Sequence, residues 1–192
     1  MMEIKAKVQD MMAGGLIVSP HFLELVKATG CFEIECQDKN GRLKWIDKSK
    51  NLVVNVGLQY LAGVGLTSTT QITTWYVGLY GAGASNTPAA SDTMSSHAGW
   101  TEVVAYSEAT RVAATFAAAT NANPSVVTNT ASKAQFSING TTTVGGAFLT
   151  SSSTKSGTAG TLFSAADVSS PGDRSVVSGD ILLVTYTFSL SA

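Results

Sequence analysis

The segment DILLVTYTFSL, residues 180–190, alternates large apolar side chains with small hydroxyl side chains along most of its length. One set of alternate positions is apolar throughout, comprising Leu182, Val184, Tyr186, Phe188 and Leu190. The other set includes Thr185, Thr187 and Ser189. Because successive side chains of a β-strand point to opposite faces, this alternation predicts a strand with one buried face.

Six further segments from residue 71 onward have apolar or β-branched runs between polar loops, namely 71–80, 101–106, 111–117, 132–138, 142–149 and 160–165. The loops between them are rich in Gly, Ser, Thr, Asn and Pro, which favour turns. We therefore predict a mainly β protein, an antiparallel β-sandwich or jelly-roll-like fold. Within 142–149, Gly145 and Gly146 indicate a bulge or a close approach of two backbones.

The stretch CFEIECQ-DKNG-RLKWI, residues 31–46, is typical of a hairpin, because DKNG supplies turn residues between two alternating runs. Its apolar face is predicted to hold Phe32, Ile34, Cys36, Leu43 and Trp45. Its charged face is predicted to pair Glu33 and Glu35 with Arg42 and Lys44. Cys31 and Cys36 would point to opposite faces of one strand, so we expect both thiols to be reduced.

Residues 51–66 are the best helix candidate, with Asn51 as the N-cap and an apolar stripe at helical spacing. A strand over 52–56 is the competing interpretation, because Gly57 and Gly63 weaken the helix. Residues 1–30 are predicted to form an N-terminal arm, or a short helix after Pro20, with the sandwich domain over 31–192.

Composition excludes several classes of protein. The 192 residues carry a net charge of −1, with no basic patch for nucleic acid. No apolar run is long enough to span a membrane. Residues 1–50 hold 8 Lys and Arg and 7 Asp and Glu, whereas the other 142 residues hold only 4 and 6. A surface with so few charges suits a protein that is covered by neighbours.

The densest polar cluster is DTMSSHAGWTE, residues 92–102. Residue types alone would allow Ser95 or Ser96, His97 and Asp92 to act as nucleophile, base and orienting acid. The favoured interpretation is structural: Asp92 caps a turn, His97 bonds the loop backbone and Trp100 anchors the loop.

Other chemical sites are equally weak. Carboxylate pairs could be drawn from Asp92, Glu102 and Glu108, but any chain with 13 acids allows this. His21 and His97 have no second His or Cys at ligand spacing. We predict no catalytic, metal or cofactor-binding residues. A sugar platform could use Trp75, Tyr76, Tyr80 or Trp100, although core or interface positions are favoured for these aromatics.

Five segments in order resemble a group of poorly characterised structural proteins of tailed bacteriophages and prophages. These are WYVGLY (75–80), ASDTMSSHAGWTE (90–102), AYSEATR (105–111), SKAQFSINGTTTVGGAFL (132–149) and SGDILLVTYTF (178–188). The resemblance covers roughly residues 31–190, with RVAATF departing from it where a proline is expected after Arg111. It implies a virion component, encoded among head and tail genes, and transfers no active-site residues.

From this resemblance and the composition we expect a non-enzymatic capsid decoration (cement) protein, found in the virion and assembled in the host cytoplasm. It would form a homo-oligomer, expected to be a trimer, and brace the major capsid protein, with the N-terminal arm as a clamp. The alternatives are a tail or head–tail connector protein, or a receptor- or glycan-binding module that uses Trp75 or Trp100.

Overall fold

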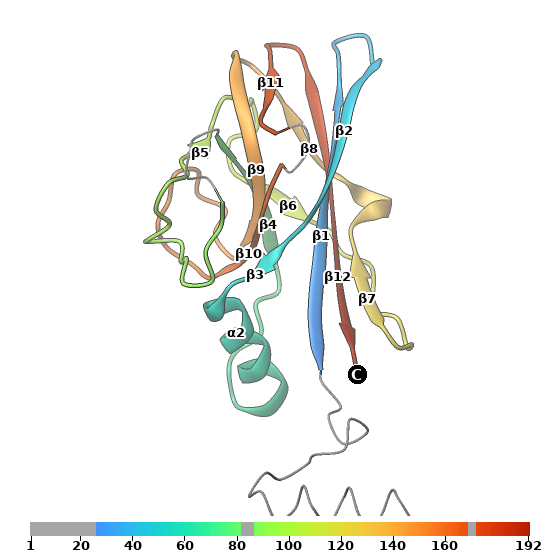
Figure 1. Cartoon of the computed structure of the whole chain (residues 1–192), viewed down its shortest axis with the longest axis vertical. Helices are drawn as coiled ribbons and strands as arrows, with labels where there is room; N and C mark the ends of the chain where they lie inside the picture. Colours follow the sequence, from blue (N-terminus) through green and yellow to red (C-terminus); the bar gives the residue numbers. More distant parts are fainter. Residues whose placement is uncertain (1–25, 82–86, 169–171) are drawn as a thin grey trace, which may run out of the picture.

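The computed structural model describes residues 26–81, 87–168 and 172–192. They form two antiparallel sheets packed face to face, so the predicted mainly β sandwich is confirmed (Figure 1). The first sheet contains β1 (Lys27–Gln37), β2 (Leu43–Lys50), β7 (Ser125–Thr128), β8 (Ala134–Ser137) and β12 (Ile181–Ser191). The second contains β3 (Leu52–Val53), β4 (Trp75–Gly81), β5 (Glu102–Val103), β6 (Val112–Ala114), β9 (Thr142–Thr150), β10 (Leu162–Asp167) and β11 (Arg174–Val176).

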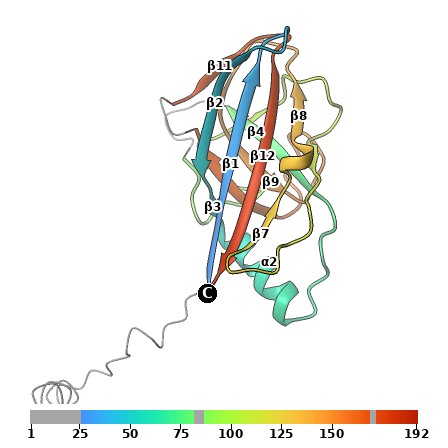
Figure 2. The same ribbon diagram turned by 90° about the vertical axis from the view of Figure 1, so that its right-hand side faces the viewer.

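Strand β12 is the centre of the first sheet. It pairs with β1 over its whole length, and with β8 and β7 in turn along its other edge (Figure 2). Its apolar set faces the second sheet as predicted, with Val184 and Tyr186 fully buried. Thr185 is also buried, on the outer face, where the ion pair between Glu35 and Lys133 crosses over β12. The outer face of this strand is therefore less open than its hydroxyls suggest.

The second sheet is buried on both faces. One face packs against the first sheet, whereas the other carries Tyr80, Phe148 and Leu162 under a cover that includes Met94 and Trp100. This double burial explains the continuous apolar runs in β4, β9 and β10.

The predicted close approach at the glycine pair is confirmed at Gly146. A Cβ atom on Gly146 would collide with the Tyr80 ring and the Ala166 carbonyl oxygen. Next to it the pairing of β9 changes partner, because Gly146 lies opposite β10 and Val144 lies opposite β11. The glycine pair therefore marks the point where β9 exchanges one neighbour for another.

The hairpin is present, but its predicted register is wrong. A bulge beside Cys36 moves β2 along β1, so Glu33 lies opposite Lys48 and Glu35 lies opposite Ile46. The ion partner of Glu35 is Lys133, at 2.9 Å, whereas Lys44 pairs with Asp180 at 2.5 Å.

Two other details of the hairpin are settled by its faces. Leu43, predicted to be on the apolar face, is 57% exposed. Both cysteines are free and lie on opposite faces of β1, as expected, with Cys36 buried and Cys31 half-buried.

Strand β1 begins at Lys27, inside the segment 1–30 that was predicted to form an arm. The rest of that prediction, His21 included, falls on residues 1–25 and lies outside the described residues.

The helix α2 (Asn55–Leu66) is shorter than predicted, and Asn51 is not its N-cap. Leu52 and Val53 form β3, so the competing strand interpretation holds for these two residues. Asn51 instead donates its Nδ2 to the Tyr186 hydroxyl at 2.8 Å, and its backbone N–H bonds the Gly30 carbonyl at 3.0 Å. Among the described residues, no helix has the length and hydropathy needed to cross a membrane.

Candidate functional site

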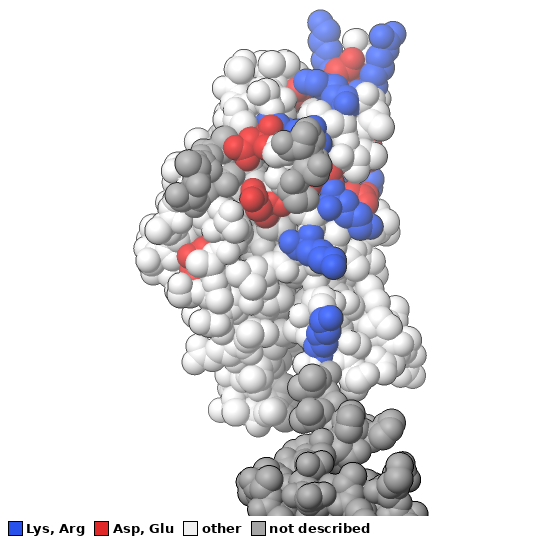
Figure 3. Space-filling view, in the orientation of Figure 1, with Lys and Arg blue, Asp and Glu red and all other residues white. Residues whose placement is uncertain are grey.

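One end of the sandwich is built almost entirely from uncharged residues. No Asp, Glu, Lys or Arg occurs in residues 51–91, 112–132 or 181–192. The fold brings α2, residues 67–74, residues 115–128 and the last residues of β12 to the same end, which we call the uncharged end (Figure 1). In Figure 3 the charged side chains gather over the other half of the molecule, around the β1–β2 hairpin.

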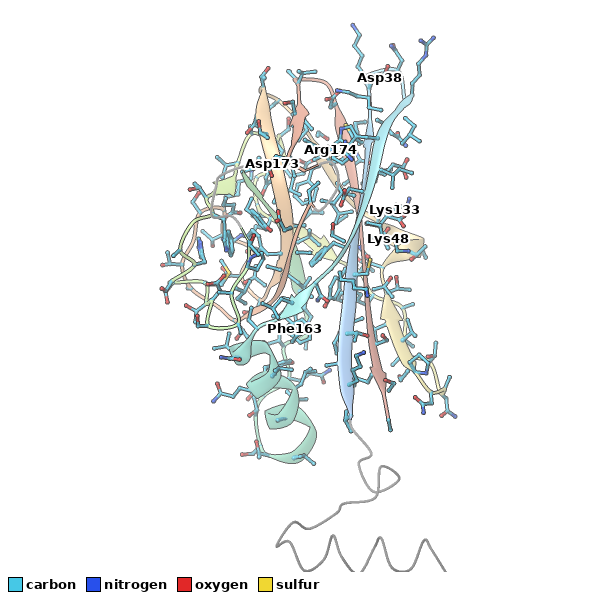
Figure 4. All side chains as sticks on the ribbon, in the orientation of Figure 1. Asp38, Lys48, Lys133, Phe163, Asp173 and Arg174 are labelled. Atoms are coloured by element: carbon cyan, nitrogen blue, oxygen red, sulfur yellow. The ribbon has the colours of Figure 1, made fainter. Side chains whose placement is uncertain are left out.

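An apolar groove of about 380 Å³ opens at the uncharged end, between α2 and the two sheets. Figure 4 places Phe163 near the start of α2, facing the space between the sheets. Residues from both sheets and the helix line the groove, including Leu61, Val64, Trp75, Phe163, Phe188 and Leu190.

Interlocking aromatic rings fix the walls of this groove. Trp75 meets Tyr60 and Phe163 edge-on, with ring centroids 5.2 and 5.3 Å apart, and Phe163 meets Phe188 at 5.3 Å. The Tyr60 hydroxyl accepts the Ile72 N–H at 2.8 Å, which ties α2 to the link that leads into β4. The groove is therefore preformed, with the apolar and aromatic lining typical of binding sites.

Exposed apolar side chains surround the groove. Leu66, at the end of α2, is 88% exposed, and Val26, just before β1, is 75% exposed. Leu190 is 37% exposed at the end of β12, opposite Ala28 of β1. Lys27 follows Val26, so a charge lies at the edge of this otherwise apolar surface.

The loop over residues 87–101 has the structural role that its sequence predicted. The Asp92 carboxylate accepts the Ala89 N–H at 2.9 Å and the Trp100 indole N–H at 3.3 Å. His97 lies 3.1 Å from the Trp100 carbonyl through Nδ1 and stacks on the Trp100 ring. The triad arrangement is not formed. The Asp92 carboxylate accepts from Trp100, and the hydroxyl of the exposed Ser95 hydrogen-bonds the Thr93 hydroxyl at 3.1 Å.

The three carboxylates considered for paired catalysis serve three separate contacts. Glu102 holds Arg111 through two hydrogen bonds of 2.9 and 2.7 Å. Glu108 accepts the Ser137 N–H, and Asp92 fixes the loop described above. In the described part of the chain, no three His, Cys, Asp or Glu side chains are placed to hold a metal ion.

Two aromatics of the possible sugar platform are unavailable to a ligand, because Tyr80 and Trp100 are buried in the core. Burial raises the pKa of Tyr80. Trp75 lines the groove and Tyr76 is half-exposed. Sequence reasoning missed the groove itself, although the long uncharged runs in the printed sequence were a signal for it.

Comparisons with known proteins add no family assignment: no family model, no curated protein and no solved structure matches this chain.

Proposed function

We propose that this chain is a non-enzymatic structural subunit that assembles with other proteins through its uncharged end. The observation that carries the proposal is the preformed apolar groove, set in an end of the molecule with almost no charge. Burying apolar surface is the main driving force of most protein association. An uncharged surface also avoids the cost of removing charged groups from water.

The polar groups of the sandwich support a structural role. Asp92, Glu102 and Glu108 each make contacts that hold loops or strands in place. Arg111 is buried and uses its guanidinium on Glu102 and two backbone carbonyls. Side chains that are fixed in this way favour a rigid body over a reactive centre.

The specific form that we propose is a capsid decoration protein of a tailed phage, a homotrimer that braces the major capsid protein. The resemblance of residues 75–80, 90–102, 105–111, 132–149 and 178–188 to phage structural proteins supports this assignment. The sandwich supports it too, because its two sheets give a rigid body from which one end can contact a lattice.

The location can be tested on intact virions. The copy number per virion is measured from band intensity against the major capsid protein, and electron microscopy then locates the chain. Hundreds of copies on the head are expected. A few dozen copies or fewer, with density confined to the tail, would support the tail or connector alternative. Absence from purified virions would contradict both assignments.

The contact surface can be tested with two exposed leucines at opposite ends of the molecule. Leu66→Glu places a charge beside the groove, and Leu43→Glu places one on the charged hairpin. Both side chains are exposed, so neither change should alter the melting temperature by more than a degree or two. We expect Leu66→Glu to block incorporation into particles and Leu43→Glu to leave it unchanged. Equal incorporation of the two variants would refute the proposed surface.

The glycan-binding alternative depends on Trp75 and Tyr76, since Tyr80 and Trp100 are buried. A glycan array decides it. Specific binding that is lost in Tyr76→Ala would favour this alternative, and no binding by the native chain would remove it.

A further inference from the structure

We infer that the groove receives the apolar stretch LIVSPHFLEL, residues 16–25, of a neighbouring copy of the chain. This inference rests on the proposed function, because it names the partner of the uncharged end. It starts from the place where the chain enters the described part of the molecule.

The chain enters at the uncharged end, beside the groove. Lys27 lies opposite Ser191, and Ala28 lies opposite Leu190, which lines the groove. Strand β1 runs from this end into the sandwich, so the described chain begins at the uncharged end (Figure 1). The exposed Val26 side chain adds to the apolar surface there.

The chemistry of residues 16–25 fits the groove. Six of the ten residues are Leu, Ile, Val or Phe, and Glu24 is the one acid. A cavity of about 150 Å³ is enough to hold a benzene ring. A groove of about 380 Å³ therefore has room for two large apolar side chains. The described residues that line the groove carry no charge, so none of them opposes the entry of an apolar segment.

The geometry favours a neighbouring copy over the same copy. To fill its own groove, the chain would have to turn back just before Lys27. Residues 21–26, HFLELV, contain no Gly, Pro, Asn, Asp or Ser, which are the usual turn formers. The nearest such residues are Ser19 and Pro20, about 20 Å along an extended chain from Val26. A turn there would leave the run Leu16–Val18 outside the groove.

The length of the preceding segment allows exchange between copies. Twenty-five residues precede Val26 and span roughly 80 Å when extended. Each copy would then lend a segment and receive one. Such an exchange accounts for the groove, the uncharged end and the apolar segment together.

Photo-cross-linking in the full-length chain tests this inference. A benzophenone amino acid replaces Gln71, an exposed residue at the groove, and a control replaces Gln135, an exposed residue of β8. We expect a covalent dimer from position 71, with the cross-link mapped by mass spectrometry to residues 16–25. Position 135 should give no such product.

Three outcomes would overturn the inference. A cross-link to residues 16–25 within one chain would show that the segment folds back on its own copy. A dimer cross-linked from position 71 to α2 of another copy would show end-to-end packing, which contradicts segment exchange but leaves the proposed function intact. In particles that contain the chain, cross-links from position 71 to a different protein only would show another partner.

A double variant gives an independent readout. Ile17→Asp with Phe22→Asp should abolish the cross-linked dimer, because each change places a carboxylate in the apolar segment that would enter the groove. A dimer band equal to that of the native chain would overturn the inference. Failure of the proposed function would instead appear as normal incorporation of Leu66→Glu, so the two failures are distinguishable.

Discussion

Replacing Arg111 should be among the most damaging single changes outside the apolar core. The side chain is fully buried and donates to both carboxylate oxygens of Glu102, at 2.9 and 2.7 Å. It also donates to the carbonyls of Ser152 and Gly157, at 3.0 and 2.9 Å, and lies over the Phe148 ring. One guanidinium thus ties β5 and the loop after β9 to the outer face of the second sheet.

The magnitude follows from what Arg111→Met leaves behind. The Glu102 carboxylate, only 7% exposed, would lose its counterion while staying buried. Removing one partner of a buried ion pair costs about 3–5 kcal/mol, because the remaining charge is uncompensated. For a domain of this size, that loss lowers the melting temperature by on the order of 10 °C. Adding Glu102→Gln should recover part of the loss, since glutamine is neutral and can still accept the Ser156 N–H.

Urea unfolding followed by tryptophan fluorescence and circular dichroism measures these changes. Arg42→Met, at the exposed hairpin turn, is the matched control and should change the free energy of unfolding by less than about 0.5 kcal/mol. The expected order of stability is native, then the double variant, then Arg111→Met. A loss below about 1 kcal/mol for Arg111→Met, or a double variant no more stable than the single one, would refute the reasoning.

Three further predictions concern the core. Val184→Asp should abolish soluble folding, because it buries an unpaired carboxylate. Thr187→Asp, on the outer face of β12, should be tolerated. Equal expression of both variants as soluble protein would contradict the assigned faces. Gly146→Ala should cost about 1–3 kcal/mol in urea unfolding, whereas Gly140→Ala, where a Cβ fits, should cost less than half of that. Burial raises the pKa of the Cys36 thiol to about 11, so iodoacetamide at pH 8.5 should modify this thiol only after the chain is unfolded. Peptide mass spectrometry measures the labelling, and rapid labelling of the native chain would contradict the burial of Cys36.

Much of the sandwich was predictable because its strongest signals are local. The alternation in residues 180–190 gave the central strand and its buried face, with Val184 and Tyr186 inside. The loop from Asp92 to Trp100 was also predictable. A carboxylate at the start of a turn and an indole further on have few partners within such a short segment.

The register of the hairpin could not be predicted, because it depends on a bulge beside Cys36 that no turn residue marks. Strands β7 and β11 were missed for a different reason. Each is only three or four residues long and is held by pairing with β12 or β9, whose positions the local sequence does not contain.

The start of the helix was mispredicted because contacts with distant strands take the residues that local sequence assigns to the helix. Asn51 is a good N-cap by residue type, yet it is used to hold Gly30 of β1 and Tyr186 of β12. The two residues that follow it pair with β10, which delays the helix to Asn55. Gly57 then allows α2 to lie against the Phe163 carbonyl, where a Cβ atom would collide.

The groove is the product of these distant contacts, which explains why its lining cannot be read from any one segment. Leu61 and Val64 come from α2, Trp75 from β4, and Phe188 from β12. The charged side chains gather in the other half of the molecule, where the β1–β2 hairpin carries ion pairs such as Lys48 with Glu33 (Figure 3). In the proposed assembly, a free subunit would keep one charged half that favours solution, and its association would draw on apolar burial at the other end. Because salt screens charges and leaves apolar burial largely unaffected, contacts made through this end should depend weakly on ionic strength.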